Sequence, residues 1–524
     1  MAAKLELLDL PLIILQLIIE NADRQDIKSF RLVSRTCRHL GERVLFRSLK
    51  IHDRDPHSET IIPYICNRIC DSGDSLPRNI HHLQVGPLED DSNYPEAEVL
   101  AHMIQNMRGL RNFTWHVRFA IPLVVLDSLS ANRPAARLHI INWCRNEQGR
   151  PYIPPDTQAL SSLQLYSLDY TAYAEPKDIL WGRRTFISEL PTIKDALLQA
   201  KNLKSLALRG EVIKGIRQDS WSVGDRNMDF RPEDRFPALE ALSVEIDHYD
   251  FTREHCPKWA KAMDWSMLRN LNLERGAPEN LLEALTGKLP QLKSLTFGLE
   301  LLFLLDLGYY NKFEAFLNGI VGLEKVVAAS PIGVLWSRIA LPLYTKHGHS
   351  LKLLHVKCSS DTDRAWEEAD VRTLVELCPG IEDLSLRAAL IENVSRDRRE
   401  SAWPEATTAA LLNLNHLRNL EIYFDADENI LEYTYSEGGG KFIVEEAAER
   451  RVVQLYEQLM DSREDSVLES VTVRFTASYP AIKEWVFRVI TASHLKRTFD
   501  IQRDFTNPYV EWDIVNPLGR NYDP

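Results

Sequence analysis

The sequence predicts an α/β fold in which a small all-helical module at the N-terminus precedes a solenoid of repeated strand–helix units. Two observations carry this prediction. The first 50 residues contain two stretches with helical spacing of apolar residues. Behind them, one short apolar phrase returns at intervals typical of stacked repeats.

The first predicted helix has more apolar surface than a small module can hide. Asp9 can cap the helix, and Pro11 suits its first turn. From Leu10 to Ile19 nearly every residue is apolar. A helix that is apolar all round must be covered on all sides. The segment therefore predicts either a partner protein or a larger surrounding domain.

A second helix is predicted from Ser34 to about Arg47, and it lies in a basic segment. Val33, Cys37, Leu40 and Val44 form one helical stripe. Residues 24–50 contain eight basic and two acidic residues, while the whole chain has a net charge of −13. A local basic segment on an acidic protein favours an acidic partner surface.

These residues resemble an F-box. The resemblance rests on the Leu10-Pro11 pair, the run 30–34 (FRLVS) and the run 45–47 (LFR). It implies that the module docks to a Skp-type adaptor and, through that adaptor, to a cullin. The alternatives are a helix pair within the core of a larger helical domain, or a basic amphipathic segment for membranes or nucleic acid. The resemblance implies that these residues lie at the adaptor interface: Leu10, Pro11, Ile14, Ile18, Leu32, Val33 and Cys37.

A repeated phrase runs through the rest of the chain: an apolar residue, two variable residues, leucine or an equivalent, one variable residue, and another apolar residue. Most intervals lie near or slightly above the roughly 20–29 residues of a leucine-rich repeat. We therefore expect an F-box over 1–51, an irregular leucine-rich-repeat horseshoe over 52–497 and a C-terminal cap over 498–524. The central apolar anchors are Leu83, Phe113, Leu138, Leu163, Leu206, Leu242, Leu271, Leu295, Val326, Leu354, Leu384, Leu420 and Val471.

Candidate substrate-binding residues lie on the predicted concave wall and on insertions that follow the strands. Strand alternation places polar residues on the wall, and loop aromatics are favoured anchors in interfaces. The alternatives are a merely solvated wall and aromatics that pack back onto the solenoid. The wall candidates are His355, Arg387 and Tyr423, and the loop candidates are Trp221, Tyr249, Tyr309, Tyr310 and Tyr433.

The sequence lacks the spacings that catalysis or metal binding would need. It contains no paired zinc-type cysteines, phosphate-binding loop or nucleophile elbow. We expect no enzyme activity, no cofactor and no metal, and the acidic composition argues against nucleic acid as a partner. The seven scattered cysteines and the absence of a signal peptide predict a cytoplasmic or nuclear protein without a membrane association.

These features predict the substrate-recognition subunit of an SCF-type E3 ubiquitin ligase, which recruits a protein target for ubiquitination and catalyses nothing itself. Two alternatives stay open. One is an F-box protein that acts outside a cullin complex as a binding or assembly scaffold. The other is a receptor gated by a small molecule, which a deep polar pocket would favour.

Overall fold

The computed structural model divides the chain into two compact units, residues 1–268 and 269–524, each treated by itself. The described residues are 10–51, 58–71, 73–87, 96–117, 119–142, 154–172, 174–180, 183–210, 227–246, 249–274, 278–298, 307–329, 333–357, 366, 368–388, 409–426, 468, 470–477, 485–490 and 502–504.

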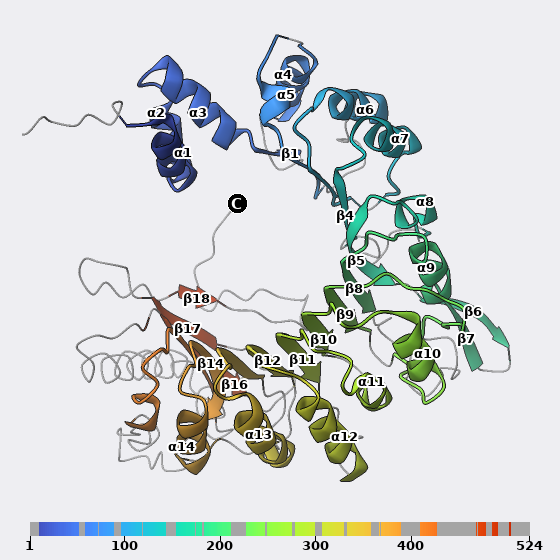
Figure 1. Cartoon of the computed structure of the whole chain (residues 1–524), viewed down its shortest axis with the longest axis vertical. Coiled ribbons are helices and arrows are strands. Elements are labelled where there is room, and N and C mark those ends of the chain that lie inside the picture. The colour runs from blue at the N-terminus through green and yellow to red at the C-terminus, as the bar shows by residue number, and fades with distance from the viewer. Residues whose placement is uncertain are drawn as a thin grey trace, which may run out of the picture. The chain divides into compact units, whose positions relative to one another are not determined.

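Three helices open the first unit: α1 (Leu12–Glu20), α2 (Arg24–Phe30) and α3 (Arg35–Leu45) (Figure 1). The Asp23 carboxylate begins α2 by accepting hydrogen bonds from the backbone N–H groups of Gln25 and Asp26, both at 2.8 Å. The Ser34 hydroxyl caps α3 by accepting from the Cys37 N–H at 3.1 Å. The predicted start of this helix is confirmed, whereas Asp9 lies outside the described residues.

A parallel sheet follows in the first unit, with its strands side by side in chain order. In Figure 1 the helices after α3 lie along one side of this sheet. The strands are β1 (Ser48–Ile51), β2 (His82–Val85), β3 (Asn112–Trp115), β4 (Arg137–Ile141), β5 (Leu165–Ala172), β8 (Ser205–Gly210) and β9 (Ala241–Glu245). The helices are α4 (Ser58–Cys70), α5 (Leu76–Asn79), α6 (Ala97–Asn106), α7 (Leu123–Asn132), α8 (Thr157–Leu160), α9 (Leu190–Leu197) and α10 (His255–Ala262). An antiparallel hairpin, β6 (Ala174–Leu180) and β7 (Arg183–Ser188), stands apart from the sheet.

The second unit repeats the same architecture. Its parallel strands are β10 (Asn270–Leu273), β11 (Ser294–Gly298), β12 (Lys325–Ala329), β13 (Leu353–Lys357), β14 (Asp383–Ala388), β15 (Asn419–Ala426) and β16 (Ser470–Ala477). They alternate with α11 (Glu279–Leu285), α12 (Leu307–Asn318), α13 (Gly333–His347) and α14 (Glu368–Leu377). Antiparallel strands β17 (Trp485–Ile490) and β18 (Gln502–Asp504) follow β16. The predicted α/β repeat fold is therefore confirmed within each unit.

The register of the strands confirms the predicted anchors almost throughout. In the first unit Leu83, Phe113 and Leu138 are successive partners, and Leu206 is paired with Leu242. In the second unit the ladder runs through Leu271, Leu295, Val326, Leu354, Leu384, Leu420 and Val471. All of these anchors are buried. Because each strand cannot hide its apolar face alone, stacking in this register forms one continuous core per unit.

Two details of the predicted array were wrong. Leu163 is 62 % exposed and precedes β5, and it is Leu168 that lies opposite Leu206. A register shift between β4 and β5 moves the anchor along the strand, so the spacing alone misplaced it. The sheet also begins earlier than residue 52, because β1 places Leu49 opposite Leu83.

Gly86, the residue directly after β2, has a backbone conformation that only glycine adopts freely. Its φ is +91°, and a Cβ at this position would collide with the backbone carbonyl of His116. Gly287 has a similar φ of +75° with open space around it. We expect Gly86→Ala to cost about 2–4 kcal/mol of unfolding free energy, and Gly287→Ala about 1 kcal/mol. Urea unfolding of both variants tests this; equal losses would show that the contact with His116 contributes nothing.

Candidate adaptor-docking surface and solenoid wall

The N-terminal helices enclose a small core of their own. Leu15 and Ile19 from α1 pack with Ile27 and Leu40, and all four are buried. Leu10 packs partly against this cluster. The side chain of Cys37 is completely buried. The core thus uses one side of α1 and leaves its other sides uncovered.

The uncovered surface is apolar. On α1 the residues at i, i+1, i+4 and i+5 from Ile13 all face away from the core, although each is aliphatic. The turn between α2 and α3 adds two more exposed aliphatic side chains. The exposed fractions are 55 % for Leu12, 67 % for Ile13, 39 % for Ile14, 51 % for Leu17, 43 % for Ile18, 87 % for Leu32 and 59 % for Val33. Contiguous apolar exposure of this kind marks an interaction surface.

The predicted adaptor-binding residues separate into two groups. Pro11, Ile14, Ile18, Leu32 and Val33 are exposed and available to a partner. Leu10 is half-buried, and Cys37 faces the interior, so the expectation that Cys37 contacts the adaptor is corrected. Leu12, Ile13 and Leu17 are also exposed, although they were not predicted as adaptor contacts. In a helix whose residues are nearly all apolar, the sequence does not show which side is covered by the module's own core.

Charges next to this surface are mostly unpaired and positive. Glu42, which is buried, accepts from Arg31 at 3.1 Å and from Arg38 at 3.4 Å. Arg35, Arg43, Arg47 and Lys50 are exposed, and within the described part of the chain no carboxylate lies at salt-bridge distance from them. The module therefore offers an apolar surface with a basic surround.

The helical module is tied to the first repeat by a cluster around Phe46. The guanidinium carbons of Arg31 and of Arg68 on α4 lie 5.8 and 5.7 Å from the Phe46 ring centroid. Arg68 donates two hydrogen bonds to Asp74, at 2.7 and 3.1 Å. The hydrogen bond from Arg68 lowers the pKa of the Asp74 carboxyl. These contacts place the docking surface in a defined relation to β1 and α4.

The predicted wall residues of the second unit lie on three neighbouring strands. The His355 ring is hydrogen-bonded to the Asp383 carboxylate at 2.7 Å. The register places Arg387 of β14 directly opposite Tyr423 of β15. His355 lies opposite Ser385, which is buried. The three residues thus lie on neighbouring strands of one sheet, and the side chains of Arg387 and Tyr423 lie outside the described residues.

The loop aromatics do not form a common exposed group. Tyr249 is buried: its hydroxyl accepts from the Met228 N–H at 3.2 Å and lies 3.0 Å from Nε2 of His255. Burial raises the pKa of Tyr249 and lowers that of His255 to about 4. The prediction that Tyr249 contacts a substrate is therefore corrected: it packs back onto the solenoid. Tyr310 is half-buried on α12, and Trp221, Tyr433 and the side chain of Tyr309 lie outside the described residues.

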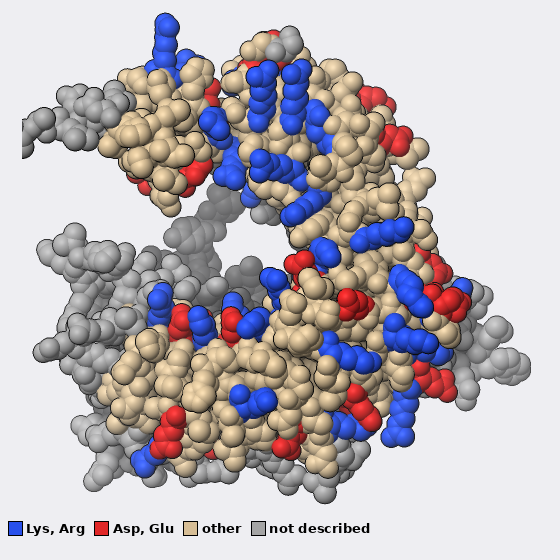
Figure 2. Space-filling model, viewed as in Figure 1, with Lys and Arg blue, Asp and Glu red and all other residues tan. Residues whose placement is uncertain are grey.

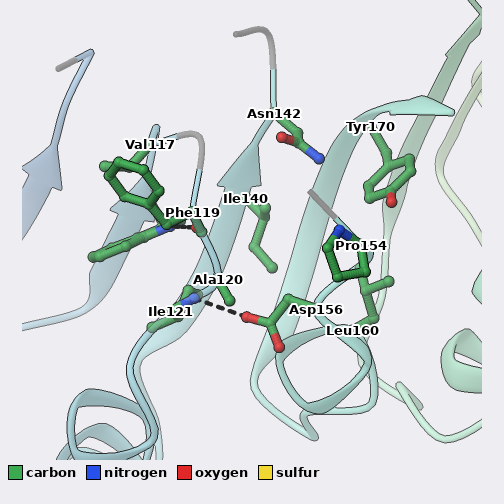
Figure 3. A pocket seen from close by; sticks show the side chains of 11 residues that line it. Val117, Phe119, Ala120, Ile121, Ile140, Asn142, Pro154, Asp156, Leu160 and Tyr170 are labelled. Carbon is green, nitrogen blue, oxygen red and sulfur yellow. Dashed lines mark hydrogen bonds between the residues drawn. The ribbon is translucent and has the colours of Figure 1, made fainter. Parts of the chain in front are cut away.

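A small pocket lies at the carboxyl ends of β3, β4 and β5 in the first unit (Figure 3). Asp156 accepts from the N–H groups of Ile121 and Ala159, at 2.8 and 3.0 Å. The Trp115 indole donates to the Phe119 carbonyl at 2.8 Å. The cavity of about 30 Å³ has room for about two water molecules. It is too small for the deep polar pocket that a small-molecule receptor needs.

The described residues contain no group of three or more His, Cys, Asp or Glu side chains arranged to hold a metal ion. Within the same residues, every helix is too short or too polar to cross a bilayer.

Comparisons with known proteins agree with the N-terminal geometry. Residues 7–49 match the family model of the F-box domain. No curated protein matches the chain. Among solved structures, a chain in the crystal structure of a TLR13–ssRNA13 complex is similar at 14 % identity with a TM-score of 0.29. That match covers 67 % of this chain, and the chain spans about half, 48 %, of the other.

Proposed function

Because the chain is an F-box protein with parallel-strand repeats behind the F-box domain, we propose that it is the substrate-recognition subunit of an SCF-type E3 ubiquitin ligase. The F-box docks to a Skp-type adaptor and so to a cullin, and the repeats recruit a protein target. The observation that carries the proposal is the exposed apolar surface of α1 and the α2–α3 turn. F-box and leucine-rich-repeat modules are typically binding modules rather than catalysts.

The exposed surface is large enough to support docking. The exposed fractions of its seven side chains add up to about four fully exposed side chains. At about 1.5–3 kcal/mol for each fully exposed side chain that becomes buried, docking gains about 6–12 kcal/mol. Association costs roughly 4–15 kcal/mol, so the basic surround adds a needed electrostatic contribution against an acidic adaptor.

The solenoid supplies the target-binding surface in this proposal. Because it holds a target near the ubiquitin-charged enzyme, it would raise the rate of ubiquitin transfer through proximity. We assign the target contacts to the wall formed by His355, Arg387 and Tyr423 and to Tyr310 of α12, and the C-terminal cap to residues 498–524. The complex would work in the cytoplasm or nucleus, where free thiols such as those of Cys70 and Cys378 stay reduced.

The docking test replaces the two most exposed residues of the α2–α3 turn. Leu32→Ala with Val33→Ala removes apolar surface without touching the module's core, because their side chains are 87 % and 59 % exposed. We expect adaptor affinity to fall about thirtyfold, which corresponds to about 2 kcal/mol. Binding of the purified adaptor by calorimetry measures the change.

The matched control is Leu163→Ala with Val321→Ala, one Leu and one Val that are 62 % and 70 % exposed elsewhere. This control should bind the adaptor as the wild type does. Equal affinity of the Leu32/Val33 variant and the wild type would refute the docking proposal. Recovery of cullin with the wild-type complex supports the ligase, and adaptor without cullin would favour the scaffold alternative.

A further inference from the structure

One position recurs in every repeat: the residue immediately before the strand. In the second unit these residues are Arg269, Lys293, Glu324, Lys352, Glu382 and Arg418, joined from one repeat to the next by backbone hydrogen bonds such as Glu324 N–H to Lys293 C=O at 2.8 Å. From Lys293 to Arg418 their charges alternate in sign, whereas Arg269 and Lys293 are both positive. Lys293 pairs with Glu324 at 3.0 Å, and Glu382 forms ion pairs with Lys352 at 3.6 Å and with Arg418 at 3.9 Å. The two glutamates thus pair with three of the four cations of this row, and Figure 2 shows blue and red side chains alternating over the second unit.

In the first unit the residues that lead into the first four strands include no carboxylate, whereas Gln164, Lys204 and Glu240 precede β5, β8 and β9. Arg47, His81 and Arg111 precede β1, β2 and β3, and Arg137 begins β4. Backbone hydrogen bonds connect them in order: His81 N–H to Arg47 C=O, Arg111 N–H to His81 C=O, and Arg137 N–H to Arg111 C=O, at 2.8 to 2.9 Å. Neighbouring strands are about 4.8 Å apart, so the row spans about 15 Å.

Further arginines enlarge this row into a basic edge. Arg43, Arg78 and Arg108 lie on the segments that lead into the same strands, and all three are exposed. Figure 2 shows blue side chains gathered over this part of the first unit. Burial and then the nearby charges of Arg111 and Arg47 lower the pKa of His81, which reflects the positive field at this edge. The sequence prediction had confined the basic patch to residues 24–50; the fold extends it to β4.

Internal roles account for only part of this charge. Arg133 donates to the carbonyls of Asn132 and Gln105, at 2.6 and 2.7 Å, so it caps helix ends. The guanidinium carbon of Arg137 lies over the Tyr166 ring, 4.2 Å from its centroid. The Asp74 carboxylate already forms a salt bridge with Arg68. Among the described residues, Arg47, Arg78, Arg108 and Arg111 have no carboxylate at salt-bridge distance.

We propose that the basic edge formed by Arg47, Arg78, Arg108, Arg111 and Arg137 binds a carboxylate-rich segment of a partner protein. Guanidinium groups bind carboxylates in bidentate fashion, and the fork geometry gives orientation as well as charge. Side chains on one face of an extended peptide recur about every 6.6 Å, so a few consecutive Asp or Glu residues can reach several of these arginines. Four of its five arginines lie beyond the F-box match at residues 7–49, in the repeats.

Charge and composition favour a peptide over a nucleic acid. Single-stranded nucleic acid is held by aromatic side chains on which bases stack. Within the described residues, Tyr64 of α4 is the single exposed large aromatic, and Tyr166 is covered by Arg137. The chain as a whole has a net charge of −13. A long polyanion would extend beyond the roughly 8 Å reach of the local field and meet that acidic surface.

The test measures binding of a fluorescein-labelled ten-residue Asp/Glu peptide to the full chain by fluorescence anisotropy. Arg111→Gln with Arg137→Gln should weaken binding about tenfold, which corresponds to about 1.4 kcal/mol. The matched control, Lys293→Gln with Lys352→Gln, removes two cations from the same position before the strands, where each is paired with a glutamate, and should bind as the wild type does. Raising the salt concentration should weaken wild-type binding more than that of the Arg111/Arg137 variant.

Arg78→Gln with Arg108→Gln provides a second variant outside the strands, in case the first loses its fold, and it should also weaken binding. Both Arg variants lie outside residues 7–49, so adaptor docking is unchanged by them and is scored separately. Undetectable peptide binding by the wild type, or equal loss in the lysine control, overturns the proposal. A ten-nucleotide RNA that binds as tightly as the peptide, with the same loss in the Arg variants, overturns it in favour of nucleic acid.

Discussion

Replacing Trp259 with alanine is expected to lower the unfolding free energy by about 3–5 kcal/mol. The Trp259 side chain is fully buried. It stacks on Phe230 at a centroid distance of 5.5 Å and contacts Trp265 at 5.7 Å and His255 at 5.7 Å. No neighbour can fill the space of an indole, so a cavity adds to the lost transfer free energy. Urea unfolding followed by tryptophan fluorescence and by circular dichroism measures the loss.

Leu163→Ala is the control for this change, because that side chain is largely exposed and its removal should cost less than about 0.5 kcal/mol. The comparison decides what the insertion after β9 does. If Trp259→Ala were as stable as the wild type, the aromatic cluster would not be a structural core. The insertion would then return to consideration as a recognition loop, as the sequence first suggested.

The second large effect is expected at a buried ion pair between α9 and the loop before β9. Lys194 is 1 % exposed, and its ammonium group donates to Asp234 at 2.9 Å and to Asp195 at 2.8 Å. Asp234→Ala leaves the ammonium with Asp195 alone, whose carboxylate is 54 % exposed. We expect a loss of about 3–5 kcal/mol, because an incompletely paired buried charge is costly. Lys194→Met with Asp234→Leu removes both charges and should cost less than the single change.

The same pair predicts how stability depends on pH. Burial alone would raise the pKa of Asp234, but the N–H of Arg231 and the Lys194 ammonium lower it below its usual range. Its contribution is therefore present above the unfolded pKa of about 3.9 and is lost as the pH falls through the folded value. Burial would lower the pKa of Lys194, yet its two carboxylate partners raise it, so its contribution is lost only at alkaline pH. In Asp234→Ala the acid-side loss should be smaller than in the wild type, and an unchanged acid limb would exclude this pair as its source.

The repeat fold could be predicted because its signal is local and repeated. Leu354 and Val326 are buried for the same reason, although their side chains differ: each strand stacks on the next with the same position facing inward. Leu163 was misplaced because a register shift is set by how two strands meet, and the spacing of leucines carries no information about it.

The docking surface was predictable as a surplus of apolar residues but not residue by residue. The stripe Val33, Cys37, Leu40 and Val44 has correct helical spacing, yet Val33 precedes α3 and is exposed while Cys37 is buried. Helical periodicity identifies residues that share a face; it does not tell whether that face meets the module's own core or a partner. The basic edge was missed for a related reason, because Arg47, His81, Arg111 and Arg137 are 26 to 34 residues apart in the sequence and come together only through the strand pairing.

The junction between α3 and β1 bears on how a target would be positioned. Phe46 and Arg47 are the two residues between them, and the Arg47 carbonyl accepts from the N–H groups of His81 and His82 at 2.9 and 3.0 Å. No linker therefore separates the docking module from the first strand. A target bound along the first unit would be held at an offset that grows by about 4.8 Å for each strand passed. The strand on which a target docks would then determine which lysines of the target come within reach of ubiquitin.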